Sequence, residues 1–199
     1  MEKEIKSWLR ESAQLKLNVA EELSSEIQRA AEVMQGSLEK GGKVVLFGNG
    51  GSASQAQHTA TELVHQSRKS EKARVAIPAM VLGENMAYMT AVANDWGFER
   101  VFERQVEALV HPQDVVIALT TSGNSLNVLR GLEKAKEKGA RTICLSGKGG
   151  GKTKGMVDVN IIVPSENVEL IQEAHLTILH ILCNLAEQWE GRDNDNTLK

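Results

Sequence analysis

The sequence has little cysteine, no excess of basic charge and no long apolar run, and each shortage excludes a class of protein. Its two cysteines, Cys144 and Cys183, lie inside apolar runs and are too few for a disulfide framework, which indicates buried thiols in a reducing compartment. A net charge of -3 and a pI near 6.0 give no basic field for nucleic acid. No stretch approaches the ~20 apolar residues of a membrane span, and residues 1–17 contain no signal-peptide core. We therefore expect a soluble cytoplasmic protein that binds neither nucleic acid nor membrane.

The N-terminal segment is the first regular pattern in the chain. Apolar residues recur at helical spacing through residues 3–39, and Gly41-Gly42 ends the pattern, which predicts one long helix or two helices joined near Asn18 as a hairpin. The wide apolar stripe has to be buried, either on the chain's own sheet or, as we expect, against other copies of the chain. We predict a helical oligomerisation segment (1–40), a main domain (41–190) and a disordered polar tail (191–199).

Short β-like runs alternate with helical segments after Gly42. This alternation predicts an α/β fold of three αβα layers, in which a five-stranded parallel sheet is flanked by helices. The 199 residues are enough for one substantial core of this kind. The expected strands are 44–47, 75–82, 115–119, 142–145 and 159–163, and the expected helices are 52–65, 85–94, 98–109, 125–138 and 168–189.

Two turns rich in glycine and hydroxyl groups each close an expected strand. The first is Phe47-Gly48-Asn49-Gly50-Gly51-Ser52, and the second is Thr120-Thr121-Ser122-Gly123-Asn124-Ser125. Glycine lets the backbone approach an oxyanion closely, and hydroxyl groups donate hydrogen bonds without a fixed positive charge. Either turn alone is more often an ordinary tight turn, but two at equivalent places indicate a bound phosphate ester. Neither matches a nucleotide-binding pattern, so we favour a sugar phosphate.

A carboxylate and imidazoles accompany these turns. His58 and Glu62 are four residues apart in an expected helix and share one face, while His180 lies in the apolar last helix, where polar groups need partners. Such groups beside a phosphate site move a proton between C1 and C2 of a sugar through an enediolate, with Glu62 as base and His180 as acid. The alternatives are a hydrogen bond on the helix surface for the first pair and a core histidine for His180.

The same residues with Gln172 form a mixed nitrogen and oxygen set that Zn²⁺ accepts, although an amide oxygen is an uncommon zinc ligand. Gln172 and His180 are eight residues apart, which corresponds to ~12 Å of rise on a straight helix. One ion reaches both only if the helix begins late or if two subunits contribute.

The motifs in chain order resemble a known family. They are Gly48-Asn49-Gly50-Gly51-Ser52, His58-x-x-x-Glu62, Asn94-Asp95, Thr121-Ser122-Gly123-Asn124-Ser125, and Ile171-Gln172-Glu173-x-His175 followed by His180. Over residues 3–189 the chain resembles the phosphoheptose isomerases of the sugar-isomerase (SIS) domain superfamily. The resemblance implies conversion of D-sedoheptulose 7-phosphate to D-glycero-D-manno-heptose 7-phosphate, the first step of activated heptose synthesis for surface lipopolysaccharide. It also implies a homotetramer with active sites at subunit interfaces and one Zn²⁺ per subunit.

The family's site residues carry over by motif. Glu62 and His180 would be catalytic, and zinc would be held by His58, Glu62, Gln172 and His180. The residues implied to bind the substrate are Asn49, Gly50, Gly51, Ser52, Glu62, Asn94, Asp95, Thr120, Thr121, Ser122, Ser125 and Gln172, of which Ser52, Thr120, Ser122 and Ser125 would hold the phosphate.

The chain departs from the family pattern at three places. The family usually has Gly-Arg shortly after the Glu-Leu of the first helix, whereas here the first arginine after Glu62-Leu63 is Arg68. Leu170 stands where the family tends to have an arginine directly before Ile171, and Thr120 stands where a serine is commoner. An isomerase or sensor of another sugar phosphate is therefore one alternative. A non-catalytic relative that binds the bacterial replication initiator as a tetramer is another, but it lacks counterparts of Glu62 and His180, and this chain has both.

Overall fold

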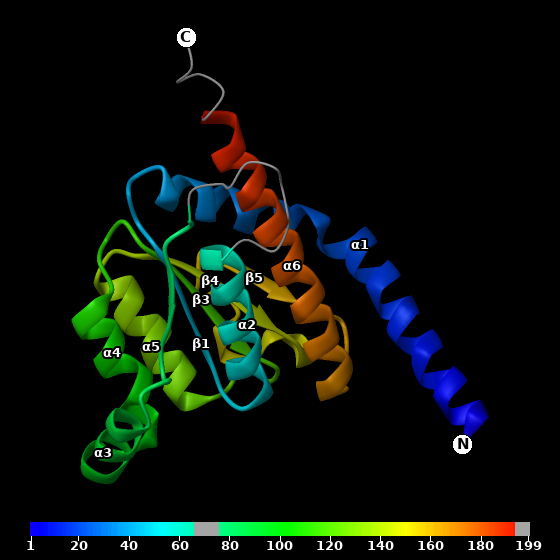
Figure 1. The fold of residues 1–199 in the computed structure, drawn as a ribbon. Coiled ribbons are helices and arrows are strands. Elements are labelled where there is room, and N and C mark those ends of the chain that lie inside the picture. The colour runs from blue at the N-terminus through cyan, green and yellow to red at the C-terminus, as the bar shows by residue number, and fades with distance from the viewer. Residues whose placement is uncertain (66–75, 194–199) are drawn as a thin grey trace.

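The computed structural model describes residues 1–65 and 76–193, which are arranged in layers around one parallel sheet (Figure 1). The strands are β1 (Val44–Gly48), β2 (Ala79–Val81), β3 (Val115–Thr120), β4 (Arg141–Ser146) and β5 (Val159–Ile162). They lie in the order β2-β1-β3-β4-β5, and all neighbours pair in parallel. The predicted five-stranded parallel sheet is confirmed. β1 and β3 are buried throughout, as expected for strands covered on both faces.

Alternate residues of the strands pack against two different groups of helices. Val44 and Leu46 belong to a core shared with α1 (Glu2–Leu38), α2 (Gly51–His65) and α6 (Val168–Asp193). Val45 and Phe47 point to the opposite face and pack with α4 (Val101–Leu109) and α5 (Leu126–Glu137). The period of two along each strand thus produces the three layers that the sequence predicts.

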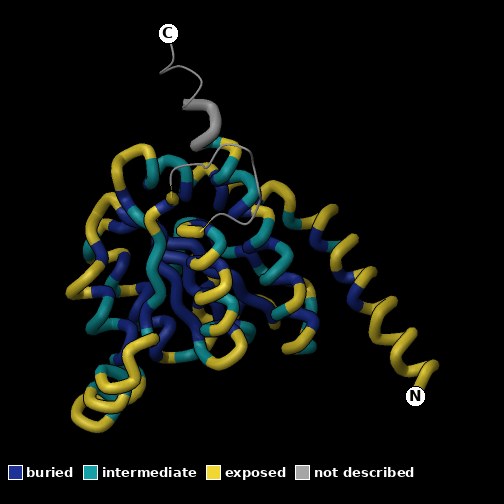
Figure 2. Tube along the Cα trace, in the orientation of Figure 1, coloured by how far each residue is buried: buried dark blue, intermediate teal, exposed yellow. Residues whose placement is uncertain are grey.

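The N-terminal segment is a single helix, so the predicted hairpin is wrong. α1 runs unbroken over 37 residues because the sequence has no glycine or proline before Gly36 that would interrupt it near Asn18. Its second half packs on the sheet and on α6, whereas its first half projects away from the sheet (Figures 1 and 2). The exposed side chains there include Ile5, Leu9 and Leu17.

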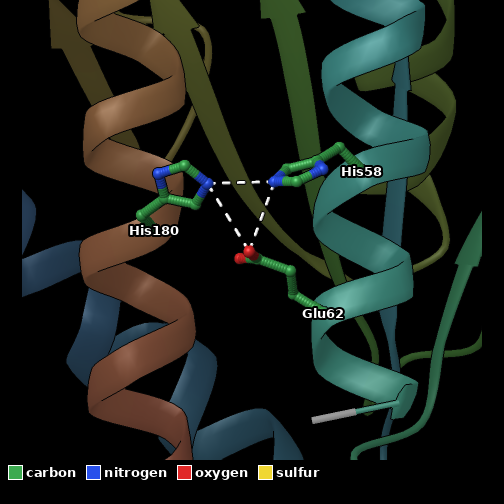
Figure 3. A group of neighbouring side chains, drawn as sticks. All are labelled: His58, Glu62 and His180. Atoms are coloured by element: carbon green, nitrogen blue, oxygen red, sulfur yellow. Dashed lines mark hydrogen bonds and ion pairs between the residues drawn. The ribbon is translucent and has the colours of Figure 1, made fainter. Parts of the chain in front are cut away.

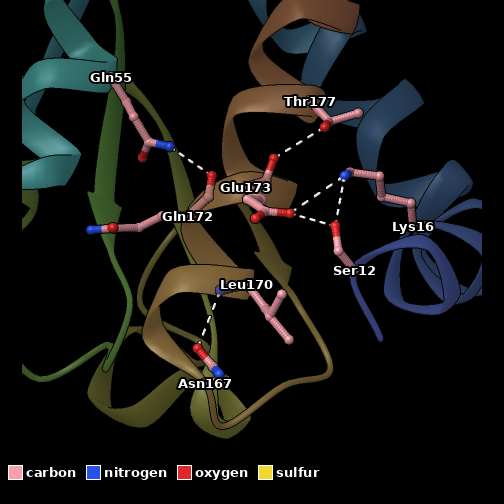
Figure 4. Close-up of polar contacts among 8 residues, drawn as sticks. All are labelled: Ser12, Lys16, Gln55, Asn167, Leu170, Gln172, Glu173 and Thr177. Carbon is pink, nitrogen blue, oxygen red and sulfur yellow. Dashed lines mark hydrogen bonds and ion pairs between the residues drawn. The ribbon is translucent and has the colours of Figure 1, made fainter. Parts of the chain in front are cut away.

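One polar contact ties the projecting half of α1 to α6 (Figure 4). Ser12 donates a hydrogen bond to the Glu173 carboxylate, and Lys16 Nζ lies 3.5 Å from Glu173 Oε2. The hydrogen bond from Ser12, with the charge of Lys16, holds the pKa of Glu173 below its usual range. Glu173, which directly follows Gln172, therefore links the two longest helices.

Other boundaries differ slightly from the predicted ones. The second strand begins at Ala79, because Pro78 has no amide hydrogen, and Val75 lies outside the described residues. The helix expected over 98–109 is divided into a 3₁₀ turn, η1 (Phe98–Arg100), and α4. α6 continues past Trp189 to Asp193, so the first residues of the expected tail are helical; residues 194–199 lie outside the described part. Within that part, no helix is long and apolar enough to cross a lipid bilayer.

Asp114 joins the start of β3 to β1. Its carboxylate accepts hydrogen bonds from the Lys43 amide (3.0 Å), Lys43 Nζ (2.6 Å) and the His111 amide (2.8 Å). Burial raises the pKa of Asp114, but these hydrogen bonds outweigh it, so the pKa lies below its ordinary value. The stabilisation is fully present above the ordinary carboxyl pKa of about 4 and is lost as the pH falls through the lower folded-state value.

We expect Asp114→Asn to lower the free energy of unfolding by about 2 kcal/mol at pH 7, because charge-assisted hydrogen bonds to a buried group are lost. The difference from the unmodified protein should shrink at pH 3. Urea denaturation at the two pH values measures it, with Glu137→Gln on the exposed face of α5 as the control. An equal loss of unfolding free energy at both pH values would show that the charge of Asp114 does not contribute to stability.

Candidate active site

The two glycine-rich loops lie next to each other at the carboxyl edge of the sheet. β1 and β3 are neighbours, with Gly48 paired to Leu119 at their last shared position. From β1 the chain crosses to β2 on one side, and from β3 it crosses to β4 on the other. The loops 48–52 and 120–125 therefore flank the topological switch point, where α/β proteins bind their ligands.

The first loop requires glycine because other side chains approach its backbone. A Cβ atom at Gly51 would lie 2.7 Å from the Gln172 amide nitrogen, so a larger residue would displace that side chain. Ser52 follows in the first turn of α2 and is buried. The loop thus presents backbone amides and a hydroxyl group at a helix N-terminus, the arrangement that binds phosphate groups.

The second loop brings its hydroxyl groups together. Thr120 Oγ1 lies 3.3 Å from Ser125 Oγ, and Ser122 Oγ accepts a hydrogen bond from the Asn124 amide. Gly123 has a positive φ of 65°, and a Cβ there would lie 2.0 Å from the Gly150 carbonyl oxygen in η2 (Lys148–Thr153). The segment after β4 therefore supports this loop from behind and fixes its shape.

His58, Glu62 and His180 form one cluster between α2 and α6 (Figure 3). His58 Nε2 lies 2.9 Å from His180 Nε2, and Glu62 Oε1 lies 3.2 Å from the former and 3.5 Å from the latter. Glu62 is the least exposed of the three, with 18% of its side chain accessible, while the imidazoles are about half exposed at 49% and 42%. The structure thus joins the i, i+4 pair on α2 to the histidine of the last helix.

The cluster fits a zinc ion in both chemistry and spacing. Zn–N and Zn–O bonds of about 2.0–2.1 Å in a tetrahedral site separate neighbouring ligand atoms by about 3.3 Å. The three atoms here are 2.9, 3.2 and 3.5 Å apart, which matches one face of such a tetrahedron. The two histidines can also form a hydrogen bond with each other without a metal, since the N–H of one imidazole can donate to the ring nitrogen of the other.

Gln172 lies in α6 next to the first loop. Its side chain packs against Gly51, and its backbone oxygen accepts a hydrogen bond from Gln55 Nε2 at 2.6 Å. Gly51 and His58 are seven residues apart on α2, or about 10 Å along the helix. Within this chain Gln172 therefore lies with the loops, and its role as a fourth zinc ligand stays a prediction.

Residues 7–147 match the SIS domain family. The phosphoheptose isomerase of Aquifex aeolicus is 47% identical over 94% of this chain and 97% of its own length. The structure of a phosphoheptose isomerase from Francisella tularensis superposes with a TM-score of 0.88 at 38% identity, over 94% of this chain and 97% of that one. The structure of the phosphoheptose isomerase from Neisseria gonorrhoeae superposes with a TM-score of 0.87 at 34% identity, over 94% of this chain and 98% of that one.

This chain belongs to the phosphoheptose isomerase family. The predicted resemblance and fold class are confirmed, and the protein is an enzyme of the aldose–ketose isomerase class. The comparisons concern whole chains, so the roles of individual residues rest on the geometry.

Asn94 and Asp95, both predicted to bind substrate, lie near the end of α3 (Met86–Trp96). Asn94 Nδ2 donates to Asp95 Oδ1 at 2.7 Å, and both residues are exposed. All of α3 is exposed or half-buried, and it projects from the body beyond α4 and α5 (Figure 1). In this isomerase, their contact with a ligand stays a prediction.

Two departures from the family pattern have different outcomes. Leu170 is 1% exposed and packs in the core shared with α1, so this position contributes apolar packing to the isomerase (Figure 4). Arg68 lies outside the described residues.

His175 is a structural residue of the isomerase. It is fully buried, and its Nε2 lies 3.0 Å from the Ser146 carbonyl oxygen at the end of β4. Burial lowers the pKa of His175 to about 4, so it is neutral at pH 7 and anchors α6 to the sheet.

Sequence reasoning missed Asn127, in the first turn of α5. Its side chain is 3% exposed and bonds to Asn49 in the first loop. The available signal was an amide on the apolar face of an amphipathic helix, where a polar group needs a partner.

Proposed function

We propose that this isomerase converts D-sedoheptulose 7-phosphate to D-glycero-D-manno-heptose 7-phosphate by proton transfer through an enediolate. The observation that carries the proposal is the cluster of His58, Glu62 and His180, which lies along α2 from a loop suited to phosphate. A heptulose 7-phosphate is elongated, and its reacting carbons are at the opposite end from its phosphate. The separation of about 10 Å along the helix suits such a molecule.

The residues divide into two tasks. Ser52, Thr120, Ser122 and Ser125 hold the phosphate through neutral hydroxyl groups, with Asn49, Gly50, Gly51, Thr121, Gln172, Asn94 and Asp95 lining the sugar. Glu62 removes a proton from C1 of the ketose, and His180 protonates the C2 oxygen as the enediol forms. Return of a proton to C2 and loss of one from the C1 hydroxyl complete the aldose.

We also propose that His58, Glu62 and His180 hold one Zn²⁺ per subunit, with Gln172 as a fourth ligand. Bound zinc would act as a Lewis acid that polarises the carbonyl oxygen of the sugar. The donor set of His58, Glu62 and His180 and its 2.9–3.5 Å spacings support the zinc site. Gln172 lies with the loops in its own chain, so as a ligand it would have to come from a neighbouring subunit.

The proposed assembly is a homotetramer with its sites at subunit interfaces. The projecting half of α1 exposes the apolar side chains of Ile5 (54%), Leu9 (63%) and Leu17 (60%), which other copies of the chain would cover. A further segment available for contact is α3, whose residues are all exposed or half-buried. The reaction would supply heptose for surface polysaccharide from the cytoplasm.

Incubation with sedoheptulose 7-phosphate in deuterium oxide tests the reaction. NMR should show an aldose product with deuterium at C2, because the enediolate takes its proton from solvent-exchanged groups. Fructose 6-phosphate, a shorter ketose phosphate, is the matched control substrate and should turn over far more slowly. If the enzyme turns over only another ketose phosphate, its substrate is a different sugar. If no ketose phosphate takes up deuterium, the chain functions like the non-catalytic relative.

A further inference from the structure

Asn127 connects the two loops of the site. Its Nδ2 donates to Asn49 Oδ1 at 2.8 Å, and its Oδ1 accepts from Asn49 Nδ2 at 2.9 Å, so the two carboxamides form a reciprocal pair. Asn127 is buried in the first turn of α5, which follows the second loop, whereas Asn49 is half-buried in the first loop. A side chain of one strand-to-helix unit thus holds a side chain of the other.

The backbone of α5 fixes the orientation of this pair. The Val128 amide donates to Asn127 Oδ1 at 3.0 Å. Because a backbone amide can only donate, this bond determines which end of the Asn127 carboxamide is the oxygen. That oxygen faces Asn49 Nδ2, and the Asn127 amino group faces Asn49 Oδ1. The orientation of Asn49 is therefore set from a different element of the fold.

The pair leaves part of the Asn49 carboxamide for a ligand. A carboxamide has two N–H donors and two acceptor lone pairs, and the pair with Asn127 uses one of each. The second N–H belongs to a half-exposed side chain beside Gly50 and Gly51. A ligand oxygen in this loop would accept from a donor whose direction is already fixed, which lowers the ordering cost of binding.

We propose that Asn127 is a positioning residue that orients Asn49 toward the bound sugar phosphate and ties loop 48–52 to α5. The inference rests on the proposed function, because it takes the ligand to be a phosphorylated sugar. Asn127 then affects catalysis only through Asn49, and this distinguishes it from a residue that merely stabilises the fold.

A double-mutant cycle on kcat/KM tests this. Asn127→Ala is expected to lower kcat/KM by about 10-fold, the size of one lost hydrogen bond, mostly through a higher KM. Asn49→Ala is expected to lower it at least as much. In the Asn49→Ala background, Asn127→Ala should change kcat/KM by less than about two-fold, since the group it orients is gone. Losses that multiply in the double variant would overturn the proposal.

Two further variants keep the test decisive. Thr142→Ala is the matched control, because Thr142 is also buried and its hydroxyl group makes two hydrogen bonds at the amino end of β4, to the Asp158 carboxylate at 2.9 Å and from the Asp158 amide at 3.1 Å. It should lower the melting temperature and leave kcat/KM within about two-fold. If Asn127→Ala does not fold, Asn127→Ser replaces it in the cycle, since a serine keeps a hydroxyl group that can bond locally to the backbone and is too short to bridge to Asn49.

Failure of the proposed function would be recognised separately. If the unmodified enzyme does not isomerise sedoheptulose 7-phosphate, the same cycle is measured as the Kd of this sugar phosphate by calorimetry. Non-additive losses of affinity would then support the role of Asn127, and additive losses, or no loss, would overturn it. No binding of sedoheptulose 7-phosphate by the unmodified protein would overturn both proposals.

Discussion

Replacing Glu62 by Gln is expected to lower kcat for sedoheptulose 7-phosphate by about 1,000-fold, within the range that general base catalysis supplies. The amide keeps the size of the side chain and can still contact His58 and His180, but it cannot accept a proton from carbon. Binding of the phosphorylated sugar should change little, because the proposed phosphate contacts lie in the loops, about 10 Å away along α2. Steady-state kinetics and calorimetry with the same sugar measure the two quantities.

Thr61→Ala is the matched control for Glu62→Gln. Thr61 precedes Glu62 on α2, is exposed, and bonds only within its own helix to the Gln57 carbonyl oxygen among the contacts described. This variant should retain nearly full activity. If Glu62→Gln keeps more than about a tenth of the original kcat, Glu62 is not the base.

Removing the proposed zinc ion is expected to lower activity by about 100-fold or more, because a Lewis acid stabilises a developing charge by several kcal/mol. The enzyme should bind one zinc per subunit, measured by mass spectrometry of the metal content, and activity should return when Zn²⁺ is added after chelation. His58→Ala should bind zinc much more weakly, since it removes one corner of the 2.9–3.5 Å triangle.

His65→Ala is the control for the metal experiment, because His65 is an exposed histidine at the end of the same helix. It should bind zinc as the unmodified enzyme does. Substoichiometric metal together with full activity after chelation would show that the cluster works as a hydrogen-bonded group without an ion.

Much of the fold is predictable because strand and helix periods are local properties. Val115 to Leu119 is a continuous apolar run of strand length, and the turn at 120–125 marks its end. The shared face of His58 and Glu62 follows from the helical repeat alone. The continuity of α1 is harder to predict. The sequence is compatible with a break near Asn18, and only the absence of a helix breaker there favours a single helix.

The remaining features depend on how elements pack, which no local pattern contains. His180 joins the cluster because α6 lies against α2, where small residues such as Ala56 and Ala60 are buried between the helices and the sheet. Asn127 is buried because β1 and β3 are neighbours, although they are far apart in sequence. The sequence marks His180 as a polar residue in an apolar helix, but it does not show the partners of either side chain.

The placement of the two cysteines makes the surface of the enzyme free of native thiols. Cys144 is fully buried in β4, and Cys183 is 2% exposed in α6. Burial raises the pKa of the Cys144 thiol to about 12, so the nucleophilic thiolate does not form near neutral pH. A cysteine introduced at exposed Leu17 would therefore be the only thiol available to a maleimide dye, and energy transfer between labelled copies would report whether the α1 helices of two copies approach one another.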